Sequence, residues 1–367
     1  MEKNMGSAKK RVASVEWIRF YAATCVILCH FEALYFGENV YFGNIAIVVD
    51  FFFLVSGFLL MKDVFKKELS SAGNSLTDSF SFVFRKAEGF YAPYILAFAM
   101  TFILKMVAAQ ITNFGEIATR LFHFKWEALL LQMAGFNPSP MFGADYLVGS
   151  AWYLSAMLLA MLPVYYLASN HRHIFIVLLA PISALSVYCY IIQAHGTMDV
   201  GNEIVGFVML GTLRAFAGLC IGCICFAMYD KMNGMEWTQK RTAGLGILEG
   251  LCFLSLPCLI ILQNSISKSD TLFWILIFSV LIVLCFTGKT PIARILNAYG
   301  TNVGLYLGRL SLYIYLFHWF FVLLFVNYIP GLSYWSGQLL YCLCVFSFSM
   351  VGMIWFNKKK NRRLALR

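Results

Sequence analysis

Long apolar runs separated by short polar stretches extend along almost the whole chain. Each run has roughly the 20 residues that an α-helix needs to cross the hydrocarbon core of a bilayer. The runs predict ten membrane-spanning helices, at residues 15–36, 43–62, 90–109, 150–168, 173–193, 204–228, 243–263, 271–287, 303–327 and 334–356. The sequence therefore predicts an all-α fold, a polytopic integral membrane bundle that forms one domain over residues 1–367.

The composition agrees with a membrane protein. Hydrophobic residues make up 60% of the chain and charged residues only 13%, with a mean hydropathy of +0.74. Soluble domains carry about 25% charged residues. The net charge of +10 is spread according to the side of the membrane and forms no patch with interleaved aromatics. Membrane lipid is therefore an expected partner and nucleic acid is not.

The basic residues predict the orientation of the chain. Most of the 28 Lys and Arg fall on one side of the predicted spans, and the positive-inside rule makes that side the cytoplasm. The outer side keeps Lys105, Arg120, Lys125 and Lys268. Both termini are then cytoplasmic, with an N-terminal segment at 1–14 and a basic tail at 357–367. Polar residues interrupt the first run and no small-residue cleavage site follows, so we expect a retained helix rather than a signal peptide.

Two longer stretches lie outside the predicted spans. Residues 63–85 are polar and Ser-rich and predict a cytoplasmic loop. Residues 110–149 contain Trp126-Glu-Ala-Leu-Leu-Leu-Gln-Met and then Gly135-Phe-Asn-Pro-Ser-Pro140. Irregular backbone at membrane depth needs a cavity or a protein cover. This second stretch therefore predicts a short interfacial or re-entrant helix on the outer side, ending in a Pro-rich turn.

Ionisable residues interrupt the first two apolar runs. Arg19 and His30 lie in the first run, and their spacing places them within about 20° on one helix face and roughly 16 Å apart along its axis. Asp50 interrupts the second run, GNIAIVVDFFFLVSGFLLM. Ionisable side chains are costly to insert into a membrane, so residues of this kind are functional candidates.

These residues, with three later stretches, carry a resemblance to a known family. The Arg19–His30 spacing followed by VDFFFLVSGF resembles acyltransferase family 3. The later matching stretches are Ser150-Ala-Trp-Tyr-Leu-Ser155, Arg214-Ala-Phe-Ala-Gly-Leu and Leu307-Gly-Arg-Leu-Ser-Leu-Tyr-Ile-Tyr-Leu-Phe-His318. The resemblance runs from about residue 14 to residue 325. Proteins of this family are membrane enzymes that move acyl groups, most often acetyl, onto sugars of cell-surface glycans.

The resemblance implies a multi-pass O-acyltransferase of the cytoplasmic membrane. It implies acetyl-CoA as the donor substrate, no further cofactor, and a hydroxyl of a surface or lipid-linked glycan as the acceptor. Transfer to a hydroxyl needs a base for the proton, groups that stabilise the oxyanion and groups that hold the donor. Acyl chain length, the side of transfer, the oligomeric state and the choice between an acyl-histidine and direct transfer stay open.

The candidate catalytic residues are His30, Asp50 and Arg19. His30 is the expected base, because imidazole titrates near working pH and no other histidine lies in the first two spans. Asp50 is expected at nearly the same depth, where a carboxylate would fix the tautomer of the imidazole and support the imidazolium. The alternatives are a structural histidine and an aspartate that caps a broken helix.

Basic residues suited to phosphate are candidates for the donor site, because arginine binds phosphate in a bidentate manner. Arg19 is expected nearer the cytoplasmic face, where coenzyme A would enter, although an ion pair with Glu16 could neutralise it. Arg85 and Lys86 lie at the cytoplasmic start of the third span. Family members often carry further arginine just after this point, which this chain lacks, and a positive-inside anchor explains the two almost as well.

Two further arginines and three other side chains complete the candidate site. Arg214 lies near the middle of the sixth span, and Arg309 lies in the ninth. Trp152, Tyr153 and His318 are the acceptor candidates, because aromatic faces stack on sugar rings, although aromatic belts occupy the same depth by default. Arg309 and His318 are on roughly opposite helix faces, so the two are not expected to share one cavity.

Other functions and sites fit these residues less well. Cys220 and Cys223 have the CxxC spacing, but their flanks are apolar, and small buried cysteines explain them better than a metal does. His171 and His173 fit a solvated turn, so no metal is expected. A transporter with an intramembrane Arg/His/Asp pathway is an alternative, although paired broken spans are not evident. An acyltransferase for a small hydroxyl compound is another.

Overall fold

The computed structural model describes residues 11–38, 41–68, 76–133, 146–201, 203–205, 208–261 and 270–365. Within these ranges ten helical segments are long and apolar enough to cross a membrane. They are Ala13–Phe36, Ile45–Lys67, Leu76–Ala108, Gly149–Asn170, Arg172–His195, Leu210–Asn233, Gln239–Ile260, Asp270–Thr287, Thr301–Tyr328 and Tyr334–Lys359. The all-helical, polytopic fold predicted from the apolar runs is confirmed, and the cytoplasmic location of the termini stays a prediction.

The elements that make up these segments follow one another with few long connections. The long helices are α1 (Ala13–Phe31), α2 (Val48–Glu68), α3 (Leu76–Ala108), α6 (Trp152–Asn170), α8 (Ala180–His195), α9 (Leu210–Asn233), α10 (Gln239–Ser255), α12 (Asp270–Thr287), α14 (Thr301–Tyr328) and α15 (Tyr334–Ala365). Short helices are α4 (Phe114–His123), α5 (Lys125–Ala128), α7 (Arg172–Ile174), α11 (Cys258–Ile261) and α13 (Pro291–Ala298), with single turns η1 (Glu32–Phe36), η2 (Gly43–Ile47), η4 (Gly149–Ala151) and η5 (Phe175–Leu179).

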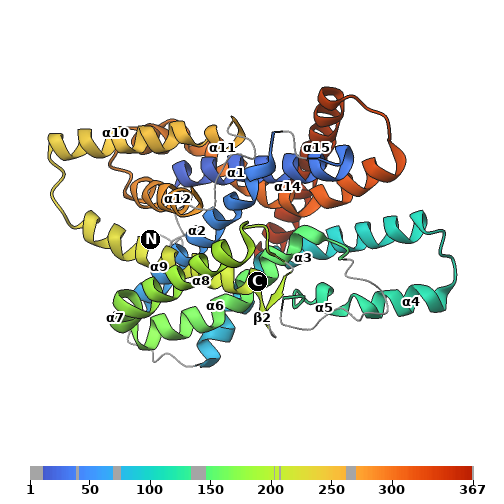
Figure 1. Ribbon diagram of the computed structural model, residues 1–367, viewed down its shortest axis with the longest axis horizontal. Helices are drawn as coiled ribbons and strands as arrows, with labels where there is room; N and C mark the ends of the chain where they lie inside the picture. Colours follow the sequence, from blue (N-terminus) through green and yellow to red (C-terminus); the bar gives the residue numbers. More distant parts are fainter. Residues whose placement is uncertain are drawn as a thin grey trace.

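Two helix pairings organise the bundle. Helix α9 packs on α2, α6, α8 and α12, whereas α1 packs mainly along α14 and only slightly on α2. Figure 1 shows α6 to α12 on the left of the molecule, α1 and α14 across its upper middle, and α3 with α4 as an arm at the right. The catalytic candidates of α1 therefore face α14, a helix from the other end of the chain.

Glycines allow both pairings to be close. A side chain at Gly222 of α9 would collide with the backbone of α2 at Leu54, which shows that the two backbones touch there. On α14, a Cβ at Gly308 would lie 2.5 Å from the Cβ of Glu16 in α1. Small residues four positions apart are a common device for helix contact in membranes, and Gly300, Gly304 and Gly308 form such a row against α1.

Three local predictions need correction. The expected loop at 63–85 is mostly helical, because α2 continues to Glu68 and α3 already begins at Leu76. The sixth span begins at Leu210 rather than 204, because a two-stranded antiparallel hairpin precedes it, with β1 (Ile204–Val205) paired to β2 (Val208–Met209). The short helix expected in the stretch 110–149 is present as α4 (Phe114–His123), but it lies before Trp126, where the chain forms only the single turn α5. The Pro-rich turn at 135–140 lies outside the described residues.

The segment between α3 and α6 is fixed by one acidic side chain. Glu127 is buried, and its carboxylate accepts the backbone N–H groups of Leu147, at 2.9 Å, and Val148, at 2.6 Å. These N–H groups precede the first turn of η4 and α6, where helix starts leave amides without partners. Glu127 therefore ties the α4–α5 segment to the start of the fourth span.

Candidate active site

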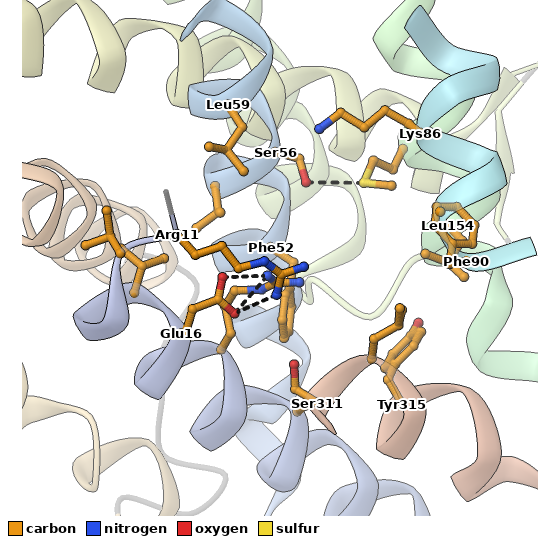
Figure 2. Close-up of a pocket in the computed structure, with 18 of the residues that line it drawn as sticks. Arg11, Glu16, Phe52, Ser56, Leu59, Lys86, Phe90, Leu154, Ser311 and Tyr315 are labelled. Atoms are coloured by element: carbon orange, nitrogen blue, oxygen red, sulfur yellow. Dashed lines mark hydrogen bonds and ion pairs between the residues drawn. The ribbon is translucent and has the colours of Figure 1, made fainter. Parts of the chain in front are cut away.

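A cavity of about 460 Å³ lies between α1, α2, α3, α6 and α14. Its charged lining consists of Arg11, Glu16, Arg19, Lys62, Asp63, Lys66 and Lys86. Its remaining lining is mostly apolar and aromatic, and includes Ala23, Phe52, Leu59, Phe90, Tyr153, Leu154, Met157, Phe286 and Tyr315. Figure 2 shows Arg11 with Glu16 on one wall, Lys86 on another, and Ser311 and Tyr315 from α14 near each other.

The lining changes from charged to apolar along the cavity. Along α1 and the two residues before it, the lining runs from Arg11 to Ala23, and on α2 it runs from Lys66 to Phe52. At 1.5 Å per residue each of these runs covers roughly 18 to 21 Å. Most of the basic groups therefore lie towards one end, with Arg19 farther along α1, and the aromatic rings of Tyr153 and Tyr315, which meet edge to face at 5.8 Å, line the apolar part.

Arg19 lies in this cavity and also pairs with Glu16. Its Nη1 is 3.2 Å from both carboxylate oxygens of Glu16, and Arg11 Nη1 approaches the same carboxylate at 3.5 Å. The ion pair that the sequence left as an alternative is thus formed. Arg19 remains about one quarter exposed, so the guanidinium is both held by an acid and open to the cavity.

His30 pairs with His318 and not with Asp50. His30 Nδ1 lies 3.0 Å from His318 Nε2, and His318 Nδ1 lies 2.6 Å from the carbonyl oxygen of Tyr315. The hydrogen bonds of Asp50 go instead to Arg214 and Tyr188. The predicted contact between His30 and Asp50 is wrong, because α1 packs on α14 and hardly on α2.

Tyr315 joins the histidine pair to the cavity. Its ring lines the cavity, its hydroxyl donates to the carbonyl of Ser150, and its own carbonyl bonds His318. His30 is not one of the residues that line the cavity, but it keeps exposed surface, whereas His318 has none. Tyr315 therefore lies between the cavity and the pair formed by His30 and His318.

Asp50 and Arg214 form a buried ion pair away from the cavity. Arg214 Nη2 is 2.6 Å from Asp50 Oδ2, and Tyr188 donates to Asp50 Oδ1 at 2.8 Å. The guanidinium also donates to the carbonyls of Ala46 and Met198. Its donors are thus engaged within the protein, and Arg214 is not placed to bind a donor molecule, which corrects the prediction for this residue.

The other predicted contacts divide between the cavity and the rest of the bundle. Lys86 and Tyr153 line the cavity, and their roles in donor and acceptor binding stay predictions. Arg85 and Arg309 are exposed outside it, and Arg309 donates to the carbonyl of Leu305 in its own helix. His318 is buried whereas Arg309 is exposed, and the two residues do not share the cavity. Trp152 packs against Arg214 and over Gly201 and Gly211, so it lies in the ion-pair region.

Two residues that the sequence did not single out lie near His30. The Trp319 ring meets His30 edge to face at 5.3 Å, and its buried Nε1 has no hydrogen-bond partner among the described residues. The charge of Asp199, an exposed residue in the loop after α8, acts on His30 and on Cys29. Neither carries a sequence signal: tryptophan is ordinary at a span end, and Asp199 lies outside the predicted spans.

The comparisons with known proteins agree with the architecture and with the motifs that led to it. A search of curated proteins and of solved structures returned no match. The family model described as an acyltransferase domain matches residues 12–358. This range includes α1 with His30, the whole lining of the cavity except Arg11, and α14 with His318. The chain therefore belongs to acyltransferase family 3, and it is a multi-pass membrane protein of that family.

Proposed function

We propose that the protein transfers an acyl group, most simply acetyl, from acyl-CoA to a hydroxyl of a surface or lipid-linked glycan. The cavity with one basic and one apolar end is the observation that carries this proposal. Phosphate groups of coenzyme A suit the end with Arg11, Arg19 and Lys86. The uncharged arm and the thioester suit the apolar end at Tyr153 and Tyr315.

His30 is the proposed base of this reaction. Its imidazole takes the proton of the acceptor hydroxyl while the hydroxyl oxygen bonds to the thioester carbonyl carbon. The carbon–sulfur bond then breaks, and the leaving thiolate takes the proton from the imidazolium. The glycan acceptor is proposed from the resemblance to the family, and the cytoplasmic membrane is the proposed location, because coenzyme A must reach the basic end of the cavity.

The test is an acyl-transfer assay in lipid nanodiscs. Purified protein is incubated with radiolabelled acetyl-CoA and surface polysaccharide from the parent organism, and label on the polysaccharide is measured. His30→Ala is expected to abolish labelling at normal protein yield. His171→Ala is the matched control, because His171 is exposed at the end of α6 and its loss is expected to leave transfer unchanged. Normal labelling by His30→Ala would exclude His30 as the base.

A small-molecule acceptor is distinguished in the same assay. Release of free coenzyme A with label on an added hydroxyl compound, and none on polysaccharide, would replace the glycan by a small acceptor. Transport is tested with the protein reconstituted in sealed vesicles. Accumulation of label inside the vesicles without consumption of acetyl-CoA would contradict acyl transfer and favour transport.

A further inference from the structure

Three groups form a hydrogen-bonded row at the histidine pair. The row runs from the carbonyl oxygen of Tyr315 to His318 Nδ1, at 2.6 Å, and from His318 Nε2 to His30 Nδ1, at 3.0 Å. The two rings lie within 8° of parallel, with centroids 5.2 Å apart. That separation is close to the greatest that two imidazoles joined by a 3.0 Å contact can have. The hydrogen bond therefore runs nearly in the plane of both rings, the preferred direction for a nitrogen lone pair.

The first member of the row decides where every hydrogen lies. A backbone carbonyl can only accept, so the hydrogen of neutral His318 must be on Nδ1. His318 Nε2 then carries a lone pair and must accept from His30. His30 Nδ1 consequently carries the hydrogen of that neutral ring, and the lone pair of His30 is left on Nε2.

The surroundings favour this arrangement. His318 is completely buried, and its ring nitrogens are both used within the row. Tyr315, which supplies the carbonyl, is itself held by its hydroxyl on the Ser150 backbone. His30 Nε2 has no hydrogen-bond partner among the described residues, and His30 keeps exposed surface. The row is fixed at the His318 end and open at the His30 end.

We propose that His318 is a positioning residue that sets the tautomer of His30, so that His30 Nε2 is the nitrogen that takes the acceptor proton. The chemical part rests on the proposed function. A carboxylate holds the imidazole in the same way in serine hydrolases, and here a second imidazole does so. The proton moves from the acceptor hydroxyl to His30 Nε2, while Nδ1–H continues to donate to His318. His318 is then not an acceptor-binding residue, contrary to the hypothesis from sequence.

Two substitutions separate positioning from packing. His318→Phe keeps a flat ring but removes the acceptor. His318→Gln offers Oε1 as an acceptor for His30 Nδ1–H. If His318 sets the tautomer, His318→Phe is expected to lower kcat by roughly 10²- to 10⁴-fold, the upper value being that of a triad whose tautomer is wrong. His318→Gln is expected to keep kcat within about tenfold of the parent, since hydrogen-bond effects of this kind are of order 1.4 kcal/mol. KM values for donor and acceptor are expected to stay unchanged in both.

Nitrogen NMR of histidine-labelled protein in nanodiscs tests the row without any assay of transfer. The His30 signals are assigned by subtraction with His30→Ala. In the parent protein at a pH where the ring is neutral, we expect a protonated Nδ1 and an unprotonated Nε2. In His318→Phe we expect the hydrogen to be distributed over both nitrogens of His30, and in His318→Gln we expect the parent pattern.

The outcomes are distinct from those of the proposed function. Hydrogen on His30 Nε2 in the parent, or an unchanged kcat in His318→Phe, would overturn the positioning role even if transfer is measured. The parent measurement requires no variant of His318, so a His318→Phe protein that fails to fold does not prevent the decision. If the parent transfers no acyl group, the proposed function fails, and the spectrum still decides the tautomer.

Discussion

The guanidinium of Arg214 lies against the carboxylate of Asp50, with Nη2 2.6 Å from Oδ2 and both side chains fully buried. Asp50→Asn leaves that guanidinium charge without its counter-ion. Loss of one partner of a buried pair is expected to lower the free energy of unfolding by about 3–5 kcal/mol. Thermal unfolding of the purified variant in nanodiscs measures this.

The double variant Asp50→Leu with Arg214→Met is the control. It removes both charges at once, and apolar replacement of buried pairs is often tolerated. We therefore expect it to be more stable than Asp50→Asn. A variant Asp50→Asn with parental stability and no transfer would instead indicate a direct catalytic role for the carboxylate.

Lys86 and Arg85 are neighbours in sequence and differ in position. Lys86 lines the cavity, whereas Arg85 is exposed outside it. Lys86→Ala is expected to raise the KM for acetyl-CoA about tenfold, equivalent to about 1.4 kcal/mol, through loss of a charge near the phosphates. Arg85→Ala is expected to leave this KM unchanged. Equal effects of the two variants would argue against a donor site at Lys86.

Asp199 contributes an exposed charge near His30. In the proposed reaction, this carboxylate would stabilise the positive imidazolium. Asp199→Asn is expected to lower kcat about threefold to tenfold at low salt and less at high salt, because exposed charges are screened over about 10 Å at 0.1 M. Steady-state rates at two ionic strengths measure this. Glu203→Gln is the control, since Glu203 pairs with His195; a similar loss there would point to a general effect of loop charge.

Glu127 predicts a pH dependence of stability. Burial raises the pKa of its carboxyl from 4.5 to about 7, although the N–H groups of Val148 and Leu147 act in the opposite direction. The folded protein therefore holds this proton at pH values where the unfolded chain has released it. Stability from this group is fully present below about pH 4.5 and is lost as the pH rises to about 7.

The measurement compares the parent with Glu127→Gln, which cannot titrate. The parental Tm is expected to rise relative to that of Glu127→Gln when the pH is lowered from 8 to 5. Parallel Tm curves for the two proteins over this interval would show that the carboxyl does not titrate there in the folded state.

The contact between Gly308 and Glu16 predicts a steric effect. A Cβ at position 308 would meet the Glu16 side chain, with 2.5 Å to its Cβ. Gly308→Ala is expected to destabilise the protein by about 1–3 kcal/mol, as overpacking does, and to weaken donor binding through the displaced Glu16–Arg19 pair. Gly244→Ala is the control in α10, where a Cβ meets nothing within 4 Å and a gain of about 0.5–1 kcal/mol is expected. Thermal unfolding measures the change in stability, and titration with acetyl-CoA measures the change in donor binding.

Much of the fold followed from local properties of the sequence. A span requires only a sufficiently long apolar run, so the segments Asp270–Thr287 and Tyr334–Lys359 could be predicted within a few residues. The start of the sixth span was misplaced, because the residues of the β1–β2 hairpin are apolar enough to extend the run. Hydropathy depends only on which residues are present, so an apolar hairpin raises it as an apolar helix does.

The sequence predicted which residues are candidates for the site much better than it predicted which residues they contact. The position of His30 or Asp50 along a span gives its depth, because the rise per residue is constant. Depth does not say which helix lies opposite. That choice depends on packing between distant segments, such as the Gly308 contact that brings α14 to α1. His318 could have been chosen as the partner of His30 only with knowledge of that pairing.

The unbroken helix α1 sets the distance between Arg19 and His30. Arg19 on this helix lines the cavity, whereas His30 lies farther along the same helix and outside the cavity lining. A rise of 1.5 Å per residue separates the two residues by roughly 16 Å along the helix axis. A donor anchored by its phosphates at Arg19 must hold its thioester at about that reach along the helix axis. In the proposed reaction, a long acyl carrier is therefore expected to reach from Arg19 to His30, and a compact activated acyl compound is not. One residue inserted between Arg19 and His30 would turn His30 by about 100° away from α14. The helix therefore fixes the direction of His30 as well as its distance from Arg19.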